Sequence, residues 1–287
     1  MAALFVALIT PFESPAGGLD RAAIGPHLRW LEANGIQGIV PCGTTGEGPS
    51  LSLAERKAVI DTCLAERGSL RVIPGTGCVS LPETIEATNY AINQGAEAAM
   101  VLPPFFFKGL SDTGLLSYYR AVCDALPAGG KIVLYHIPPV SQIPIPTAVI
   151  DGLMESHPEA IYGLKDSGGD AAYTKLLVER YPTMLTFTGG APLFTRALSD
   201  GAAGGIFALA NLFPRELREI LDGGPNASAA QARITTITNI VKNYGAVPSI
   251  KALLPFLADL PSSSCRVPLA NMSATETETL LAQIRAA

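Results

Sequence analysis

The chain has 287 residues, of which 16% are charged and 48% apolar, and its formal net charge is −5. Its 20 basic residues form no cluster of the kind that binds a phosphate backbone, so nucleic acid is not expected as a partner. No apolar run reaches the roughly 18 residues that a membrane span needs. The length fits one large α/β domain, although two ordinary domains remain possible, and the low content of charge predicts an oligomer.

The five cysteines are an odd number, and none forms a Cys-x-x-Cys pair or lies near a histidine at metal-ligand spacing. We therefore expect reduced thiols, a cytoplasmic location, no metal ion and no organic cofactor. The first twelve residues are mostly apolar, and the first basic residue of the chain is Arg21. The segment therefore lacks the positively charged start of a signal peptide. It is expected to contain a first strand.

Short apolar runs alternate with amphipathic segments as far as residue 208, which is typical of strand-helix units in a parallel sheet. Eight strands, each followed by a helix, favour closure into a (β/α)8 barrel over an open doubly wound sheet, which usually stops near six strands. No Gly-x-Gly-x-x-Gly follows the first run. The predicted strands are residues 4–9, 38–41, 71–74, 98–102, 131–135, 161–165, 185–188 and 204–208.

N-cap residues predict where several helices begin. Ser52 and Ser80 each stand three residues before a glutamate, which is the spacing of a capping box, and Asp20 and Asp170 are expected to be N-caps. Beyond residue 222 the pattern predicts helices alone, at residues 227–244, 248–258 and 274–285. We expect a barrel over residues 1–222 and a C-terminal helical extension over residues 223–287 that packs on it.

In such a barrel the active site forms at the C-terminal ends of the strands, and Lys165 stands at one of them. Among the seven lysines it alone ends a predicted strand. Poor solvation in the barrel mouth favours the neutral amine, which can attack a ketone and form an imine. The alternative is a lysine that pairs with a carboxylate inside the barrel.

Two further strand ends carry polar residues. Glycines around Thr44 and Thr45 let that loop offer N–H groups and hydroxyls to a carboxylate, although an ordinary strand-to-helix turn fits the same residues. Tyr135 can pass protons to an imine-bound substrate, whereas a lone strand-end tyrosine often serves packing. Strand alternation directs His136 away from Tyr135, towards a structural role. His27 falls in a helical pattern and is expected at the surface.

These motifs resemble the dihydrodipicolinate synthase and N-acetylneuraminate lyase superfamily. The likeness spans nearly the whole chain, and the order of its motifs at the strand ends makes it specific. The motifs are GTTGE at residues 43–47, YHIP at 135–138 and GLKDS at 163–167, together with ALITP at 7–11, GTG at 75–77, PP at 103–104 and GG at 189–190.

The resemblance implies a (β/α)8 barrel that binds a pyruvate-like 2-oxo acid as a Schiff base on Lys165. It implies that Thr44 and Thr45 hold the carboxylate of this small-molecule partner, that Thr45 takes part in a proton relay, and that Tyr135 is the proton shuttle. Two more positions, Gly190 and Ile206, match residues that line the substrate in relatives, the second through its backbone carbonyl. Family members are usually homotetramers built from dimers.

The sequence departs from the synthases of this superfamily at two places. Val140 stands where those enzymes carry an arginine that binds the second carboxylate of the substrate. The segment Pro104-Phe105-Phe106-Phe107 offers only phenylalanines where they carry a relay tyrosine from a neighbouring subunit, so Phe106 cuts the relay or leaves it to water. The segment from Lys165 to Asp170 resembles that of 4-hydroxy-2-oxoglutarate and 2-keto-3-deoxy-sugar-acid aldolases.

The leading hypothesis is therefore an aldolase that releases pyruvate from a 4-hydroxy-2-oxo acid. The same imine also permits dehydration of a 3-deoxy-2-oxo sugar acid, or the condensation of pyruvate with aspartate semialdehyde that yields 4-hydroxy-tetrahydrodipicolinate. A barrel that binds a 2-oxo acid for regulation, without catalysis, is a further alternative.

Overall fold

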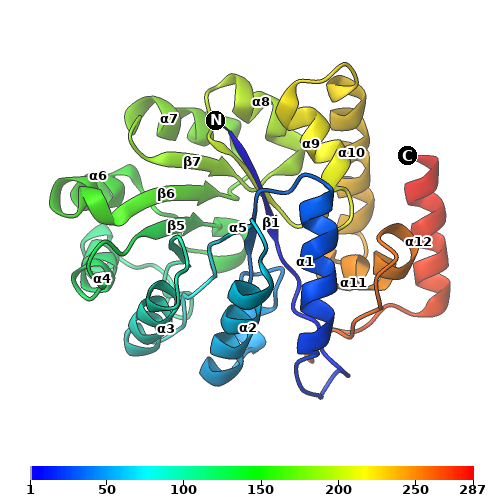
Figure 1. The fold of residues 1–287 in the computed structure, drawn as a ribbon. Coiled ribbons are helices and arrows are strands. Elements are labelled where there is room, and N and C mark those ends of the chain that lie inside the picture. The colour runs from blue at the N-terminus through cyan, green and yellow to red at the C-terminus, as the bar shows by residue number, and fades with distance from the viewer. Residues whose placement is uncertain (1) are drawn as a thin grey trace.

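The computed structural model describes residues 2–287 and contains one sheet of eight parallel strands in the order β3-β2-β1-β8-β7-β6-β5-β4 (Figure 1). A parallel bridge between Gly75 and Met100 joins the two ends of this order, and the Met100 N–H donates to the Pro74 carbonyl at 2.8 Å. The sheet is thus closed, and the prediction of a (β/α)8 barrel is confirmed. The strands are β1 (Ala3–Ala7), β2 (Gly38–Val40), β3 (Arg71–Val72), β4 (Ala99–Val101), β5 (Ile132–His136), β6 (Ile161–Asp166), β7 (Leu185–Thr188) and β8 (Gly204–Phe207).

Helices follow every strand and surround the barrel. The capping box at Ser52 is complete, since its hydroxyl accepts the Glu55 N–H and the Glu55 carboxylate accepts the Ser52 N–H. At Ser80 the hydroxyl accepts the Glu83 N–H, but among the described residues the Ser80 N–H does not donate to the Glu83 carboxylate, so only half of the predicted box forms. The helices are α1 (Ile24–Ala33), α2 (Leu53–Glu66), α3 (Leu81–Asn93), α4 (Asp112–Asp124), α5 (Pro138–Ser141), α6 (Thr147–Ser156), α7 (Ala171–Arg180), α8 (Phe194–Ser199) and α9 (Pro214–Asp222).

Alternate residues of the strands point into the barrel and out towards the helices. Phe5 and Phe187 meet edge to face inside it, with ring centroids 5.6 Å apart, and fill its centre. The outward-facing residues pack against the helices in two larger apolar clusters. Because the interior is filled with side chains, a ligand can approach only at an end of the barrel.

Three helices follow the barrel, namely α10 (Ala227–Lys242), α11 (Ala246–Leu257) and α12 (Ala274–Ala286). Figure 1 shows them together on the side of the barrel where α1 and α9 lie. Ile234, Leu253 and Leu280 are fully buried and share one apolar core with Leu217 of α9. Within residues 2–287 there is no helix of sufficient length and apolarity to cross a bilayer.

The expectation that His27 lies at the surface is wrong. The residue is buried on the inner face of α1, together with Ile24, Leu28 and Leu31. These four positions follow the i, i+3, i+4, i+7 spacing of an apolar helix stripe, and that stripe decides the orientation of the histidine. Burial lowers the pKa of His27 from 6.5 to about 4.

Candidate active site

Lys165 lies near the C-terminal end of β6, and its side chain is only 4% exposed. In the sheet it stands between Tyr135 of β5 and Phe187 of β7. Its Nζ atom lies over the face of the Tyr135 ring, 4.4 Å from the centroid. Among the described residues the lysines that form ion pairs are Lys57, Lys175 and Lys251, and Lys165 is not one of them. The lysine therefore lies in the barrel without a carboxylate to hold it.

The hydroxyls of Tyr135 and Thr44 lie 3.3 Å apart and share a hydrogen bond in which either can be the donor. Tyr135 is buried, whereas Thr44 is exposed, so the pair forms a polar path from the interior to the mouth. The resemblance implied this relay role for Thr45, which stays a prediction. Thr45 is buried and makes no such contact with Tyr135 among residues 2–287. Successive loop residues have no fixed alternation, so the orientation of the two threonines could not be derived from their order.

The loop that carries these threonines is tightly constrained. The Thr10 hydroxyl donates to the Gly46 carbonyl at 2.6 Å. A Cβ atom on Gly48 would lie 2.1 Å from the carbonyl oxygen of Cys42, so only glycine fits this close approach. Cys42 itself has a left-handed backbone, with φ 59°. The sequence around Thr44 thus folds into one defined turn at the mouth of the barrel.

Arg56 of α2 was not recognised from the sequence, although it organises this loop. Its guanidinium is buried and donates to the carbonyl oxygens of Cys42, at 3.2 Å, and Gly48, at 2.8 Å, as well as to that of Gly75. Carbonyl acceptors therefore stand in for the carboxylate that a buried arginine usually requires. Nothing in the helical pattern of α2 distinguishes this arginine from a solvated one.

His136 and Asp166 alternate with Tyr135 and Lys165 and lie on the outer side of the sheet. The Nδ1 atom of His136 accepts the Ile145 N–H at 3.1 Å. Asp166 accepts the Thr174 hydroxyl at 2.6 Å. Burial lowers the pKa of His136, while the Asp166 carboxylate opposes that shift. The predicted direction of His136, away from Tyr135, is confirmed.

Gly190 and Ile206 lie at the ends of β7 and β8. Gly190 begins the turn after β7, where its N–H donates to the Thr188 hydroxyl at 3.2 Å. It lines a pocket of about 590 Å³ between the ends of these strands and α10, with Phe207 and Lys242. Ile206 is buried in β8 and belongs to the apolar interior of the barrel.

The two places where the sequence departs from the synthases are both at the surface of this chain. Val140 in α5 is 60% exposed, and Phe106 and Phe107 are each 69% exposed. The two phenylalanine rings contact each other edge to face, 5.3 Å apart. These apolar side chains offer no hydroxyl or cation to a ligand.

In residues 2–287 no group of three or more histidine, cysteine or acidic side chains is arranged to hold a metal ion. All five cysteines are free thiols. Burial raises the pKa of Cys42 to about 12, so the thiol closest in sequence to Thr44 stays protonated. The structure thus brings Lys165, Tyr135 and Thr44 together near the mouth of the barrel.

The whole chain, residues 1–287, matches the dihydrodipicolinate synthetase family. A DapA-like lyase of Chloroflexus aurantiacus is 44% identical over 279 residues, which are 96% of this chain and 93% of that protein. A 4-hydroxy-tetrahydrodipicolinate synthase of Sorangium cellulosum is 37% identical over 74% of this chain and 70% of its own. The crystal structure of dihydrodipicolinate synthase from Aquifex aeolicus superposes with a TM-score of 0.91 at 26% identity, covering 100% of this chain and 98% of that one. The chain belongs to the dihydrodipicolinate synthetase family.

Proposed function

We propose that this protein is a lyase that forms a Schiff base on Lys165 and cleaves a 4-hydroxy-2-oxo acid, such as 4-hydroxy-2-oxoglutarate or a 2-keto-3-deoxy sugar acid, to release pyruvate. The observation that carries the proposal is the buried Lys165 amine over the ring of Tyr135, whose hydroxyl contacts Thr44 at the mouth. An amine shielded from water, beside a path for protons, suits attack on a ketone.

The reaction begins when the amine of Lys165 attacks C2 of the oxo acid and water leaves, forming a protonated imine. The C3–C4 bond then breaks, and its electron pair moves towards the imine nitrogen to give an enamine. Tyr135 takes the proton of the C4 hydroxyl while its own proton passes to Thr44 and the proton of Thr44 passes to water at the mouth, and the C4 fragment leaves as an aldehyde. Water returns a proton along the same path to C3 of the enamine, and hydrolysis of the imine then frees pyruvate and restores the amine.

The substrate carboxylate is proposed to bind at the loop of Thr44 and Thr45, where backbone N–H groups and hydroxyls are available. Gly190 and Ile206 are proposed to line the remainder of the substrate.

A second candidate is 4-hydroxy-tetrahydrodipicolinate synthase, which is the name of the Sorangium cellulosum relative. That reaction brings a second carboxylate into the site. The exposed Val140 and the phenylalanines of residues 105–107 offer this group no charge, and for that reason we favour the aldolase.

A panel assay tests the proposal. Pyruvate release from hydroxy-oxo acids of different chain length is followed through lactate dehydrogenase, with Lys165→Ala as the control for background. We expect turnover of at least one substrate and none by the variant. Formation of 4-hydroxy-tetrahydrodipicolinate from pyruvate and aspartate semialdehyde as the fastest reaction would favour the synthase instead. Loss of water from a 3-deoxy-2-oxo sugar acid would favour a dehydratase, and binding of a 2-oxo acid without turnover would favour a regulatory barrel.

We further propose that the active form is a homotetramer in the cytoplasm. The low content of charged residues and the exposed phenylalanines support subunit contacts. The five free thiols suit a reducing compartment.

A further inference from the structure

A buried ion pair connects the C-terminal extension to the loop that carries Thr44 and Thr45. Lys251 of α11 donates to Oε1 of Glu47, and both side chains are only 1% exposed. The other carboxylate oxygen, Oε2, accepts the backbone N–H of Arg266 at 2.8 Å. Lys251 also donates to the carbonyl oxygen of Ser264 at 2.7 Å. Both oxygens of Glu47 are therefore held by residues more than 200 positions away in the chain.

Glu47 is separated from Thr45 by a single residue, so a displacement of Glu47 must move the threonines. Its backbone is left-handed, with φ 53°, a conformation that is unfavourable for glutamate and persists only when its surroundings enforce it. Gly46 lies close to the neighbouring backbone, since a Cβ atom there would lie 2.8 Å from the carbonyl oxygen of Leu8. The conformation of residues 43–48 thus depends on contacts at Glu47.

Stability alone does not account for this pair. Burying two charges costs solvation free energy that their attraction often fails to recover, and well-packed apolar residues can be at least as stable. The extension is already anchored by Ile234, Leu253 and Leu280 in the common core. What an apolar pair could not provide is a carboxylate held in one orientation by two donors.

We propose that Glu47 and Lys251 are positioning residues, which fix the loop so that the Thr44 hydroxyl meets Tyr135 and the threonines face the carboxylate of a 2-oxo acid. The inference rests on the proposed function. It makes residues 223–287 part of the active-site machinery, although none of them is proposed to touch the substrate.

The test is the double variant Glu47→Gln/Lys251→Met, which removes both charges and shortens only the side chain at position 251, by one atom. Replacing both partners avoids the uncompensated buried charge that either single variant would leave. Folding is checked by circular dichroism and thermal melting. The kinetic readouts are kcat and KM for pyruvate release, and the pyruvate concentration that gives half-maximal trapping of the imine by borohydride.

We expect the double variant to fold, and its half-maximal pyruvate concentration to rise and its kcat to fall, with a combined loss in kcat/KM of about a hundredfold, the size expected for a misplacement of about 1 Å. Unchanged kinetic constants in the folded variant would overturn the inference. If the double variant does not fold, Glu47→Gln is measured alone, and wild-type values of both constants in it would also overturn the inference.

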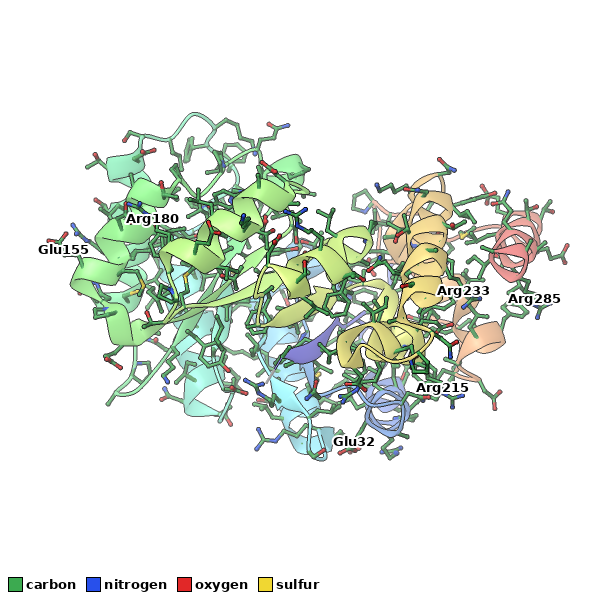
Figure 2. All side chains as sticks on the ribbon, turned by 90° about the horizontal axis from the view of Figure 1, so that it is seen from above. Glu32, Glu155, Arg180, Arg215, Arg233 and Arg285 are labelled. Atoms are coloured by element: carbon green, nitrogen blue, oxygen red, sulfur yellow. The ribbon has the colours of Figure 1, made fainter. Side chains whose placement is uncertain are left out.

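A matched control is Glu216→Gln/Arg233→Met, which removes an ion pair between α9 and α10. Arg233 extends from α10, as Figure 2 shows, and contacts Glu216 and the ring of Phe213, not the threonine loop. This variant should keep wild-type constants, and an equal loss in it would show that any disturbance of the extension lowers activity, which would also overturn the inference. Absence of imine trapping in the wild-type protein contradicts the proposed function itself, so the two failures are distinguishable.

Discussion

The hydroxyl of Tyr135 is the group through which we expect protons to reach the substrate. Tyr135→Phe keeps the ring beneath the Lys165 amine and removes only the contact with Thr44. We expect kcat for pyruvate release to fall by about 10²- to 10⁴-fold, the usual range for loss of a general acid or base. The imine should still form, because the amine is unchanged.

The control for this variant is Tyr181→Phe, which removes a hydroxyl that contacts Asp151, away from the barrel mouth. It should leave kcat unchanged. A Tyr135→Phe variant that turns over at the wild-type rate would contradict the assigned role.

His27 makes the stability of the fold depend on pH. Burial lowers its pKa from 6.5 to about 4, so between these values the unfolded chain takes up a proton that the folded chain does not. The free energy of unfolding should therefore fall as the pH drops from about 6.5 to about 4, by up to about 3 kcal/mol, and this contribution should level off below that range.

Urea unfolding at a series of pH values checks this prediction. His27→Leu removes the titrating group together with a buried ring nitrogen that has no hydrogen-bond partner among the described residues. The variant should lose this part of the pH dependence, whereas His157→Gln, at a partly exposed ion pair, should keep it. The same acid-induced loss in His27→Leu would rule out His27 as its source.

At the residue scale, Lys165 and Tyr135 could be predicted because parallel strands alternate with a period of two and end on one face. Which of Thr44 and Thr45 contacts Tyr135 could not be predicted, because side chains in a loop do not alternate with a fixed period. The partner of Glu47 could not be predicted either. Lys251 lies 204 positions farther along the chain, in a helix whose sequence does not indicate a buried ion pair.

Among the elements, α2 supports the site because Arg56 lies in its first turn and holds the threonine loop. The helix begins with the capping box of Ser52 and Glu55. Ser52→Ala should lower the free energy of unfolding by about 1 kcal/mol, the usual cost of losing an N-cap. Chemical denaturation measures this loss, and a variant as stable as the wild type would show that the cap contributes nothing here.

The eight strands could be predicted because each is a short apolar run bounded by turn residues and followed by a helical pattern. Their closure is less visible in the sequence. The strand β3 has two residues, Arg71 and Val72, and its side of the sheet meets the β4 side through a bridge at Gly75 and Met100 and a hydrogen bond from the Glu97 N–H to the Val72 carbonyl. Apart from the family resemblance, only the number of runs favoured a closed barrel over an open sheet.

At the scale of the whole molecule, low surface charge and exposed apolar side chains favour assembly. We predict that light scattering gives a mass four times the 29.9 kDa of one chain. A mass of 29.9 kDa at micromolar concentration would contradict the proposed homotetramer. The sequence indicated an oligomer through its composition, but the residues that meet in it could not be predicted from one chain.

The C-terminal helices could be predicted from their pattern, and their contribution to the threonine loop could not. The boundary expected between barrel and extension, at residue 222, coincides with the end of α9, where Gly223 adopts a left-handed backbone. The apolar core nevertheless continues from Leu217 into Ile234 and Leu253. The barrel and the extension therefore share one core. This could not be predicted, because the period of α10 and α11 fixes which of their faces are apolar but not what those faces cover.

The central claim is that the Lys165 amine forms an imine with a 2-oxo acid. The most direct measurement is mass spectrometry of peptides after incubation with pyruvate and borohydride, which reduces the imine to a stable three-carbon adduct. The account predicts that adduct on Lys165, and none on Lys165→Ala. A folded wild-type protein whose Lys165 remains unmodified would contradict it.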